Sequence, residues 1–205
     1  EAIIEYTESK FEANISEATE TFASKMAGYF KNYNGFYDWY DLKYFLFEYE
    51  MSLSEKTNIV RMNDWSNFTK SEKDKISIEL IFPQTPSKWY WRNQFRGYTE
   101  QEFHYLANSL GNLLPLSQSV NSSLQNDEFS SKKGGSEKRE RGYSNGSHAE
   151  QEVAKYIDWN PATILERGMK LLQYMEMRWG FYFKDDAMKL QVLGLSFMKD
   201  GREIP

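Results

Sequence analysis

The sequence of 205 residues contains no cysteine and only two histidines, His104 and His148. The absence of cysteine excludes a disulfide framework and any metal site built on thiolates. No apolar run approaches the roughly 18 to 20 residues that cross a bilayer, and no signal peptide is recognisable at the N-terminus. These absences predict a cytoplasmic protein that does not enter a membrane. The chain starts at Glu1 rather than methionine, so we expect it to be part of a longer protein.

The sequence also has no excess of basic residues. It contains 25 lysines and arginines and 30 aspartates and glutamates, which gives a net charge of −5. A protein that grips duplex DNA through many phosphates usually has a basic face. The charge argues against an autonomous, tight DNA binder, but it is compatible with a nuclease domain tethered to another DNA-binding part. Aromatic residues make up 17% of the chain, and their large buried areas predict a substantial core.

Helical periodicity is the main structural signal along the chain. Apolar residues recur every three or four positions from about 8 to 31, and a largely buried helix is predicted from Tyr37 to Met51. Capping sequences at Thr99, Ser147 and Asn160 mark three further helix starts, the last followed by proline and a long apolar stripe.

Two short strands are predicted in the middle of the chain. Residues 76–80 alternate apolar and polar side chains, and the apolar run from Leu110 to Leu116 is a second candidate. The fold class is therefore mainly α with a small β element. Residues 130–147 are rich in Ser, Gly, Lys and Arg, with five basic residues against two acidic ones. This composition indicates either a solvated loop or a flap that contacts phosphate.

The most specific text is the run from Ile78 to Gln84, which reads Ile-Glu-Leu-Ile-Phe-Pro-Gln. It is followed by Leu-Gly-Asn-Leu at 110–113, by Asn121-Ser122, and by Phe129 with Lys132 or Lys133. This pattern resembles the C-terminal nuclease domain of GmrSD-type modification-dependent restriction enzymes, an HNH (His-Me finger) family. Its members carry E-H-I-x-P-Q, L-G-N-L, N-S and F-x-x-K motifs. The resemblance covers roughly residues 36–180.

The resemblance implies a role for each matching residue. Glu79, as a ligand or as a carboxylate just behind the ligands, and Asn121 would hold Mg²⁺ or Mn²⁺, an ion that stabilises the leaving oxygen when a phosphodiester breaks. Asn112, on the second strand, would orient the general base. Lys132 or Lys133 would approach substrate phosphate. These elements would form a ββα-metal (HNH-like) finger embedded in a helical domain. The alternative to metal binding is that Glu79 is an ordinary surface carboxylate and that Asn121 is an asparagine at the start of a helix.

The general base itself falls on Leu80. Leucine neither accepts a proton nor orients a water, and a general base contributes about 10²–10⁴-fold to the rate. We therefore predict that the chain is inactive, or nearly so, as written. An engineered replacement and a natural degenerate copy are both consistent with Leu80. Neither His104 nor His148 is expected to take over, since an exposed or capping role suits each of them better.

The predicted function is that of a DNA endonuclease domain of a restriction or phage-defence protein, inactivated at Leu80. The alternative is a non-catalytic pseudo-nuclease module that binds DNA or a partner protein. By resemblance, the full-length protein would carry an N-terminal, NTP-using, ParB-like domain. This chain has neither an Asp-Gly-x-x-Arg motif nor a Gly-rich phosphate loop, so we expect no nucleotide hydrolysis from it. Residues 1–35 would lead in from the upstream domain, residues 36–183 would form the nuclease domain, and residues 184–205 would be a C-terminal tail.

Overall fold

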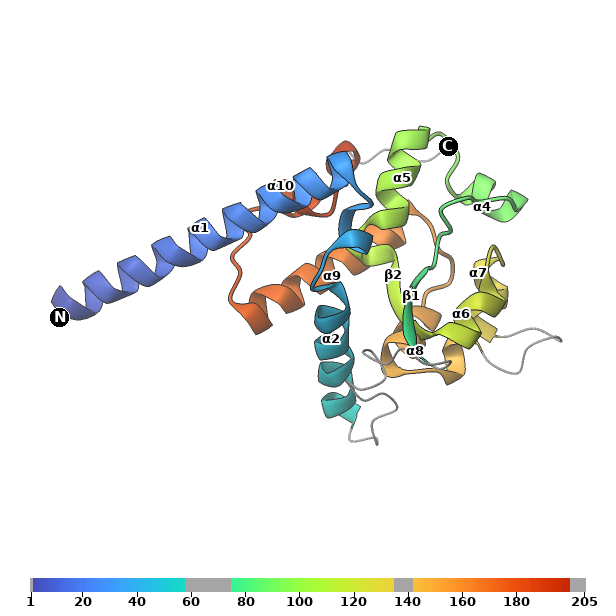
Figure 1. Ribbon diagram of the computed structural model, residues 1–205, viewed down its shortest axis with the longest axis horizontal. Helices are drawn as coiled ribbons and strands as arrows, with labels where there is room; N and C mark the ends of the chain where they lie inside the picture. Colours follow the sequence, from blue (N-terminus) through green and yellow to red (C-terminus); the bar gives the residue numbers. More distant parts are fainter. Residues whose placement is uncertain (1, 58–74, 135–141, 200–205) are drawn as a thin grey trace.

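The structure is a computed structural model that describes residues 2–57, 75–134 and 142–199, with side chains for residues 14–55, 75–134 and 142–199. It is mainly helical, with one small antiparallel sheet at its centre, which confirms the predicted fold class (Figure 1). The helices are α1 (Ala2–Asn32), α2 (Leu42–Thr57), α4 (Trp89–Gln94), α5 (Glu100–Asn108), α6 (Gln118–Leu124), α7 (Phe129–Gly134), α8 (His148–Ala154), α9 (Pro161–Trp179) and α10 (Asp186–Val192). The described residues also form the 3-10 turns η1 (Gly35–Asp38), η2 (Leu110–Asn112), η3 (Tyr143–Asn145) and η4 (Ser196–Met198).

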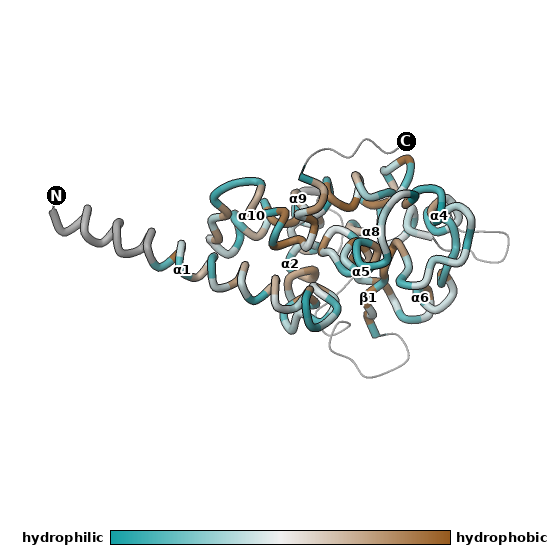
Figure 2. The backbone as a smooth tube through the Cα atoms, turned by 90° about the horizontal axis from the view of Figure 1, so that it is seen from above, coloured by the Kyte–Doolittle hydropathy of each residue, from teal (hydrophilic) through white to brown (hydrophobic). Residues whose placement is uncertain are grey.

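The sheet consists of two antiparallel strands, β1 (Ile76–Leu80) and β2 (Leu113–Ser117), in which Glu79 pairs with Leu114 and Leu80 with Leu113; α4 and α5 lie between the strands in the chain. α6 and α7 lie on one side of it and α2 on the other (Figures 1 and 2). Apolar segments, brown in Figure 2, gather around α9, α10 and β1, whereas the outer turns are hydrophilic. Within the described part of the chain, no helix combines the length and apolar character needed to span a bilayer.

Local sequence signals set most helix boundaries. Thr99 and Ser147 form reciprocal capping boxes with the glutamates three residues later, as predicted. α9 begins with Asn160 as its N-cap and Pro161 in its first turn, and it ends at Gly180 in the left-handed conformation. These signals depend only on neighbouring residues, which is why they can be recognised in the sequence.

Three segments differ from the sequence-based expectation. α2 starts at Leu42 rather than Tyr37, because residues 35–38 form the separate turn η1. The first three residues of Leu-Gly-Asn-Leu form η2, so Asn112 precedes β2 instead of lying on it. The described part of the expected C-terminal tail contains α10, which packs against α1 and buries apolar side chains such as Val192.

Gly111 brings α9 into direct backbone contact with η2. A Cβ built at Gly111 would lie 1.9 Å from the carbonyl oxygen of Ile164 and 2.8 Å from the backbone nitrogen of Gly168, both on α9. Any other residue would push the helix away. Arg167, completely buried on the same helix, donates from Nη1 to the carbonyl oxygens of Gly111 (2.7 Å) and Leu113 (2.9 Å). α9 therefore packs directly against the Leu-Gly-Asn-Leu segment.

We predict opposite effects of alanine at two glycines. Gly111→Ala should lower the free energy of unfolding by about 3 kcal/mol or more, because the clash is with backbone that cannot rotate away. Gly28→Ala, inside α1 with nothing within 4 Å of the added Cβ, should raise it by about 0.5–1 kcal/mol. Urea unfolding of both variants measures the difference. Equal stability of the two variants would contradict the close approach of α9.

Candidate active site at the end of the first strand

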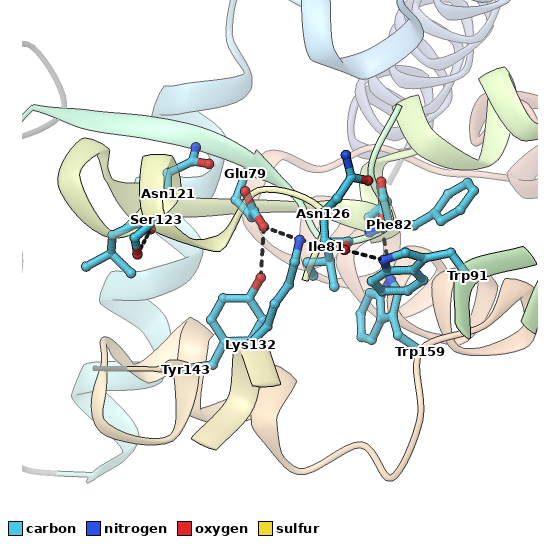
Figure 3. A network of polar contacts seen from close by, with 12 residues as sticks. Glu79, Ile81, Phe82, Trp91, Asn121, Ser123, Asn126, Lys132, Tyr143 and Trp159 are labelled. Carbon is cyan, nitrogen blue, oxygen red and sulfur yellow. Dashed lines mark hydrogen bonds and ion pairs between the residues drawn. The ribbon is translucent and has the colours of Figure 1, made fainter. Parts of the chain in front are cut away.

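The candidate site surrounds the end of β1, where the Glu79 side chain lies beside Lys132 of α7 and Tyr143 of η3 (Figure 3). The Glu79 side chain is only 4% exposed. Its Oε1 accepts a bond from Lys132 Nζ at 2.6 Å and another from the Tyr143 hydroxyl at 3.1 Å. The carboxylate of the strand is therefore enclosed by a cation from α7 and a phenol from η3.

Lys132 is completely buried, contrary to the exposed position that contact with substrate phosphate requires. Besides Glu79, its ammonium donates to the carbonyl oxygen of Ile81 at 3.0 Å, and it lies 5.8 Å from the centre of the Trp91 ring. Charge, hydrogen bonding and an aromatic face all stabilise the cation where it is.

The Phe-x-x-Lys spacing explains how the lysine reaches this place. Residues three apart in a helix share a face, so Phe129 and Lys132 both point inward from α7. Phe129 is completely buried and packs on Trp159, with ring centres 5.3 Å apart. Anchoring Phe129 in the core directs Lys132 to the end of β1.

Asn112 uses all the hydrogen bonds that its side-chain amide can form. Its Nδ2 donates to the carbonyl oxygens of Phe82 (2.9 Å) and Ala107 (2.8 Å). Its Oδ1 accepts from the backbone N–H of Phe82 (2.8 Å) and from Trp159 Nε1 (2.9 Å). An amide has two donor protons and two acceptor positions, so none remains to orient a base at residue 80. Asn112 is a buried clamp on the chain that follows β1.

Asn121 and Leu80 are on different faces of the two-stranded sheet. Asn121 Nδ2, from α6, donates to Ser77 Oγ (2.9 Å) and to the carbonyl oxygen of Ile78 (3.3 Å). Ser77 and Glu79 share the strand face toward α6 and α7, and alternation turns Leu80 to the opposite face. Leu80 is partly exposed at the edge of the core. The structure thus places Glu79 and Asn121 near one another but does not bring Leu80 onto their face.

The remaining candidate residues, Lys133, His104 and His148, make contacts within the domain. Lys133 Nζ donates to the carbonyl oxygens of Tyr156 (2.8 Å) and Ile157 (3.3 Å). His104 is exposed on α5, and its Nε2 lies 3.3 Å from the carbonyl oxygen of Tyr33. His148 is the buried first residue of α8, and its backbone N–H donates to Glu50.

Tyr143 is a site residue that the sequence did not reveal. It lies in the polar stretch 130–147, whose described ends form α7 and η3 instead of a continuous loop. The side chain is completely buried, and this burial, together with the nearby Glu79 carboxylate, holds the pKa of the phenol well above its usual range. A lone aromatic residue in a Ser/Gly-rich stretch is the signal that would have pointed to an anchor.

The residues at this strand end do not fit a divalent cation in the observed arrangement. The Glu79 carboxylate already binds an ammonium at 2.6 Å, and Asn121 would add only one neutral amide oxygen. In the described ranges 2–57, 75–134 and 142–199, no three His, Cys, Asp or Glu residues cluster as metal ligands would. Mg²⁺ and Mn²⁺ favour several oxygen ligands, often including water, and this pair does not provide them.

Comparison with protein-family models identifies a family for most of the chain. The family model described as "GmrSD restriction endonucleases, C-terminal domain" matches residues 13–174. This range contains β1, β2, α6 and α7, and therefore the whole candidate site. Comparison with curated proteins and with solved structures finds no match.

We predict that Lys132→Met is strongly destabilising, because it leaves the Glu79 carboxylate buried without its counter-charge. The expected loss is about 3–5 kcal/mol in urea unfolding at neutral pH. The double variant Glu79→Gln/Lys132→Met should recover most of it, since no unpaired charge remains. Lys133→Met is the matched control, with an expected loss of about 1 kcal/mol. The burial of the pair would be refuted if Lys132→Met were as stable as Lys133→Met.

A second prediction concerns alkaline pH. An unfolded tyrosine loses its proton near pH 10, whereas native Tyr143 keeps it. Its contribution to stability is therefore fully present below about pH 10 and is lost above it, by about 1.4 kcal/mol per pH unit. Burial also raises the pKa of Tyr90 to about 12 and that of Tyr156 to about 12, so part of the decline remains in any single variant.

Urea unfolding between pH 8 and 11 tests the contribution of Tyr143. Tyr143→Phe should be less stable than the wild type at pH 8, because it lacks the hydrogen bond to Glu79, yet it should decline less steeply above pH 10. Tyr182→Phe, at an exposed tyrosine, should retain the wild-type slope. Identical slopes for all three proteins would count against an un-ionised Tyr143 in the folded state.

Proposed function

The chain belongs to the family of GmrSD restriction endonuclease C-terminal domains, and we propose that it is a DNA-cleaving domain whose hydrolytic step is interrupted at Leu80. The family indicates a nuclease domain of a restriction system, with DNA as the substrate of such a domain. The finer statements, that the chain acts in phage defence and is inactive as written, are ours.

The observation that carries the proposal is the contrast between residue 80 and its neighbours. Glu79 and Ile81 are held by Lys132, and both backbone polar groups of Phe82 are held by Asn112. A backbone fixed on both sides of one partly exposed position is what an active site requires, because catalytic groups must be held within a fraction of an ångström. The side chain at that position is nevertheless a leucine.

A histidine at this position would have a defined task. It would take the proton from the water that attacks the phosphodiester, and it would do so from a strand end that does not shift when substrate binds. Leu80 can only exclude water. The framework explains why the chain keeps the family pattern on either side of residue 80 while lacking the ionisable group.

The proposal extends to the rest of the protein. α1 projects from the body of the domain in Figure 1, and we propose that it joins the nuclease domain to an upstream, NTP-using, ParB-like domain. The proposed setting is the cytoplasm, where a restriction protein meets foreign DNA. Recognition of the DNA would then be shared with the upstream part, in agreement with the net charge of −5.

The test is to restore the missing group. Leu80→His should nick supercoiled plasmid at a rate about 10²-fold or more above the wild type, in buffer that supplies Mg²⁺ or Mn²⁺. Leu80→Asn, polar and similar in size but unable to act as a base near neutral pH, is the matched control and should stay inactive. Cleavage is followed by the conversion of supercoiled to open-circle plasmid on gels.

Two results would overturn the proposal. Equal cleavage by the wild type and Leu80→His would show that residue 80 is not the missing base. A folded Leu80→His that does not cleave would favour the alternative, a non-catalytic module that binds DNA or a partner protein.

A further inference from the structure

We propose that the Lys132 ammonium is the built-in cation of the strand end, occupying the place beside Glu79 that a metal ion would take, and that Lys132 positions residue 80. The family resemblance assigns Glu79 to a metal and the lysine to substrate phosphate, and the structure pairs the two with each other instead. The first part concerns Glu79 and Lys132 alone. The positioning role rests on the proposed function.

The bonds of Lys132 bracket residue 80. The same Nζ atom contacts the Glu79 carboxylate at 2.6 Å and the carbonyl oxygen of Ile81 at 3.0 Å, the residues directly before and after position 80. A single cation thereby fixes the side chain of one neighbour and the backbone of the other. Rotation of the backbone at residue 80 would have to break one of these bonds inside the protein.

Lys132 already neutralises the Glu79 carboxylate, so a further cation at that carboxylate would meet a positive charge. One carboxylate and one ammonium give a neutral pair, and Tyr143 adds a hydroxyl donor to the same carboxylate oxygen. A divalent ion at Glu79 would lie next to a lysine that is 0% exposed and cannot move into solvent without leaving the core.

A purely stabilising role would not require this chemistry. Replacing a buried ion pair by apolar residues of similar volume is often neutral or stabilising, so such a pair is weak evidence for stability. The pair instead fixes the geometry of the chain, because the ammonium contacts the Glu79 carboxylate and the Ile81 carbonyl oxygen at the same time and lies near the Trp91 ring. That requirement defines the conformation of residues 79–81.

Manganese binding tests the first part without any cleavage assay. The EPR signal of free Mn²⁺ is titrated with the full chain as wild type, Glu79→Gln and Lys132→Met. We expect the same isotherm for the wild type and Glu79→Gln. Lys132→Met should bind Mn²⁺ about tenfold more tightly or better, and adding Glu79→Gln should abolish the gain. Lys132→Gln replaces Lys132→Met if the latter does not fold.

Two outcomes would overturn the proposal that the Lys132 ammonium takes the place of a metal ion. One is stoichiometric Mn²⁺ binding by the wild type that Glu79→Gln removes. The other is a folded lysine variant that binds no more Mn²⁺ than the wild type. Neither depends on nuclease activity, so this part can fail while Leu80→His still cleaves, and the reverse also holds.

Positioning is tested in the Leu80→His background, where Lys132→Met should lower kcat with little change in KM. Lys132→Arg, which keeps the positive charge, should restore most of kcat. A loss that appears only in the amount of folded protein, with normal kcat per folded molecule, would refute the positioning role.

Discussion

The structure depends on one buried amide, Asn112, whose four hydrogen bonds join parts of the chain that are far apart in sequence. It holds Phe82 by both backbone groups, the end of α5 through Ala107, and the approach to α9 through the Trp159 indole. Each of these groups is removed from water, where an unsatisfied amide is costly. The strand end, two helices and the core aromatics therefore keep their relative positions only while this amide is in place.

Around the Asn112 amide, residues of the family-like motifs and their neighbours make packing contacts and hydrogen bonds within the domain. Gly111 lets α9 approach, Arg167 fastens α9 to η2, and Lys132 neutralises Glu79. The residues of the motif therefore mainly fix the position of the end of β1. Position 80 lies within that frame and is partly exposed, so the identity of its side chain bears on chemistry as well as on packing at the edge of the core.

Sequence reasoning succeeded where the cause was local. β1, the long helix α9 and the capping boxes at Thr99 and Ser147 follow from alternation, periodicity and side-chain caps. The partners of Lys132 and Asn112 could not be predicted, because they lie about 50 and 30 residues away, and no spacing rule specifies such contacts. Tyr143 was hidden for the same reason, since its partner Glu79 belongs to another element. The resemblance singled out Glu79, Asn112 and Lys132, which lie around the end of β1, but the partners of these side chains are seen only in the structure.

Hydrogen exchange of two backbone amides tests the fixed strand end most directly. Ile81 donates its N–H to the Asn112 carbonyl oxygen and Phe82 donates its N–H to the Asn112 side chain, and these two residues directly follow position 80. If these bonds hold residue 80 in place, both amides should exchange only through global unfolding, at rates equal to those of the slowest core amides. Exchange of Phe82 at the rate of an exposed turn amide would show that the strand end is loose, and the account of this site would be wrong.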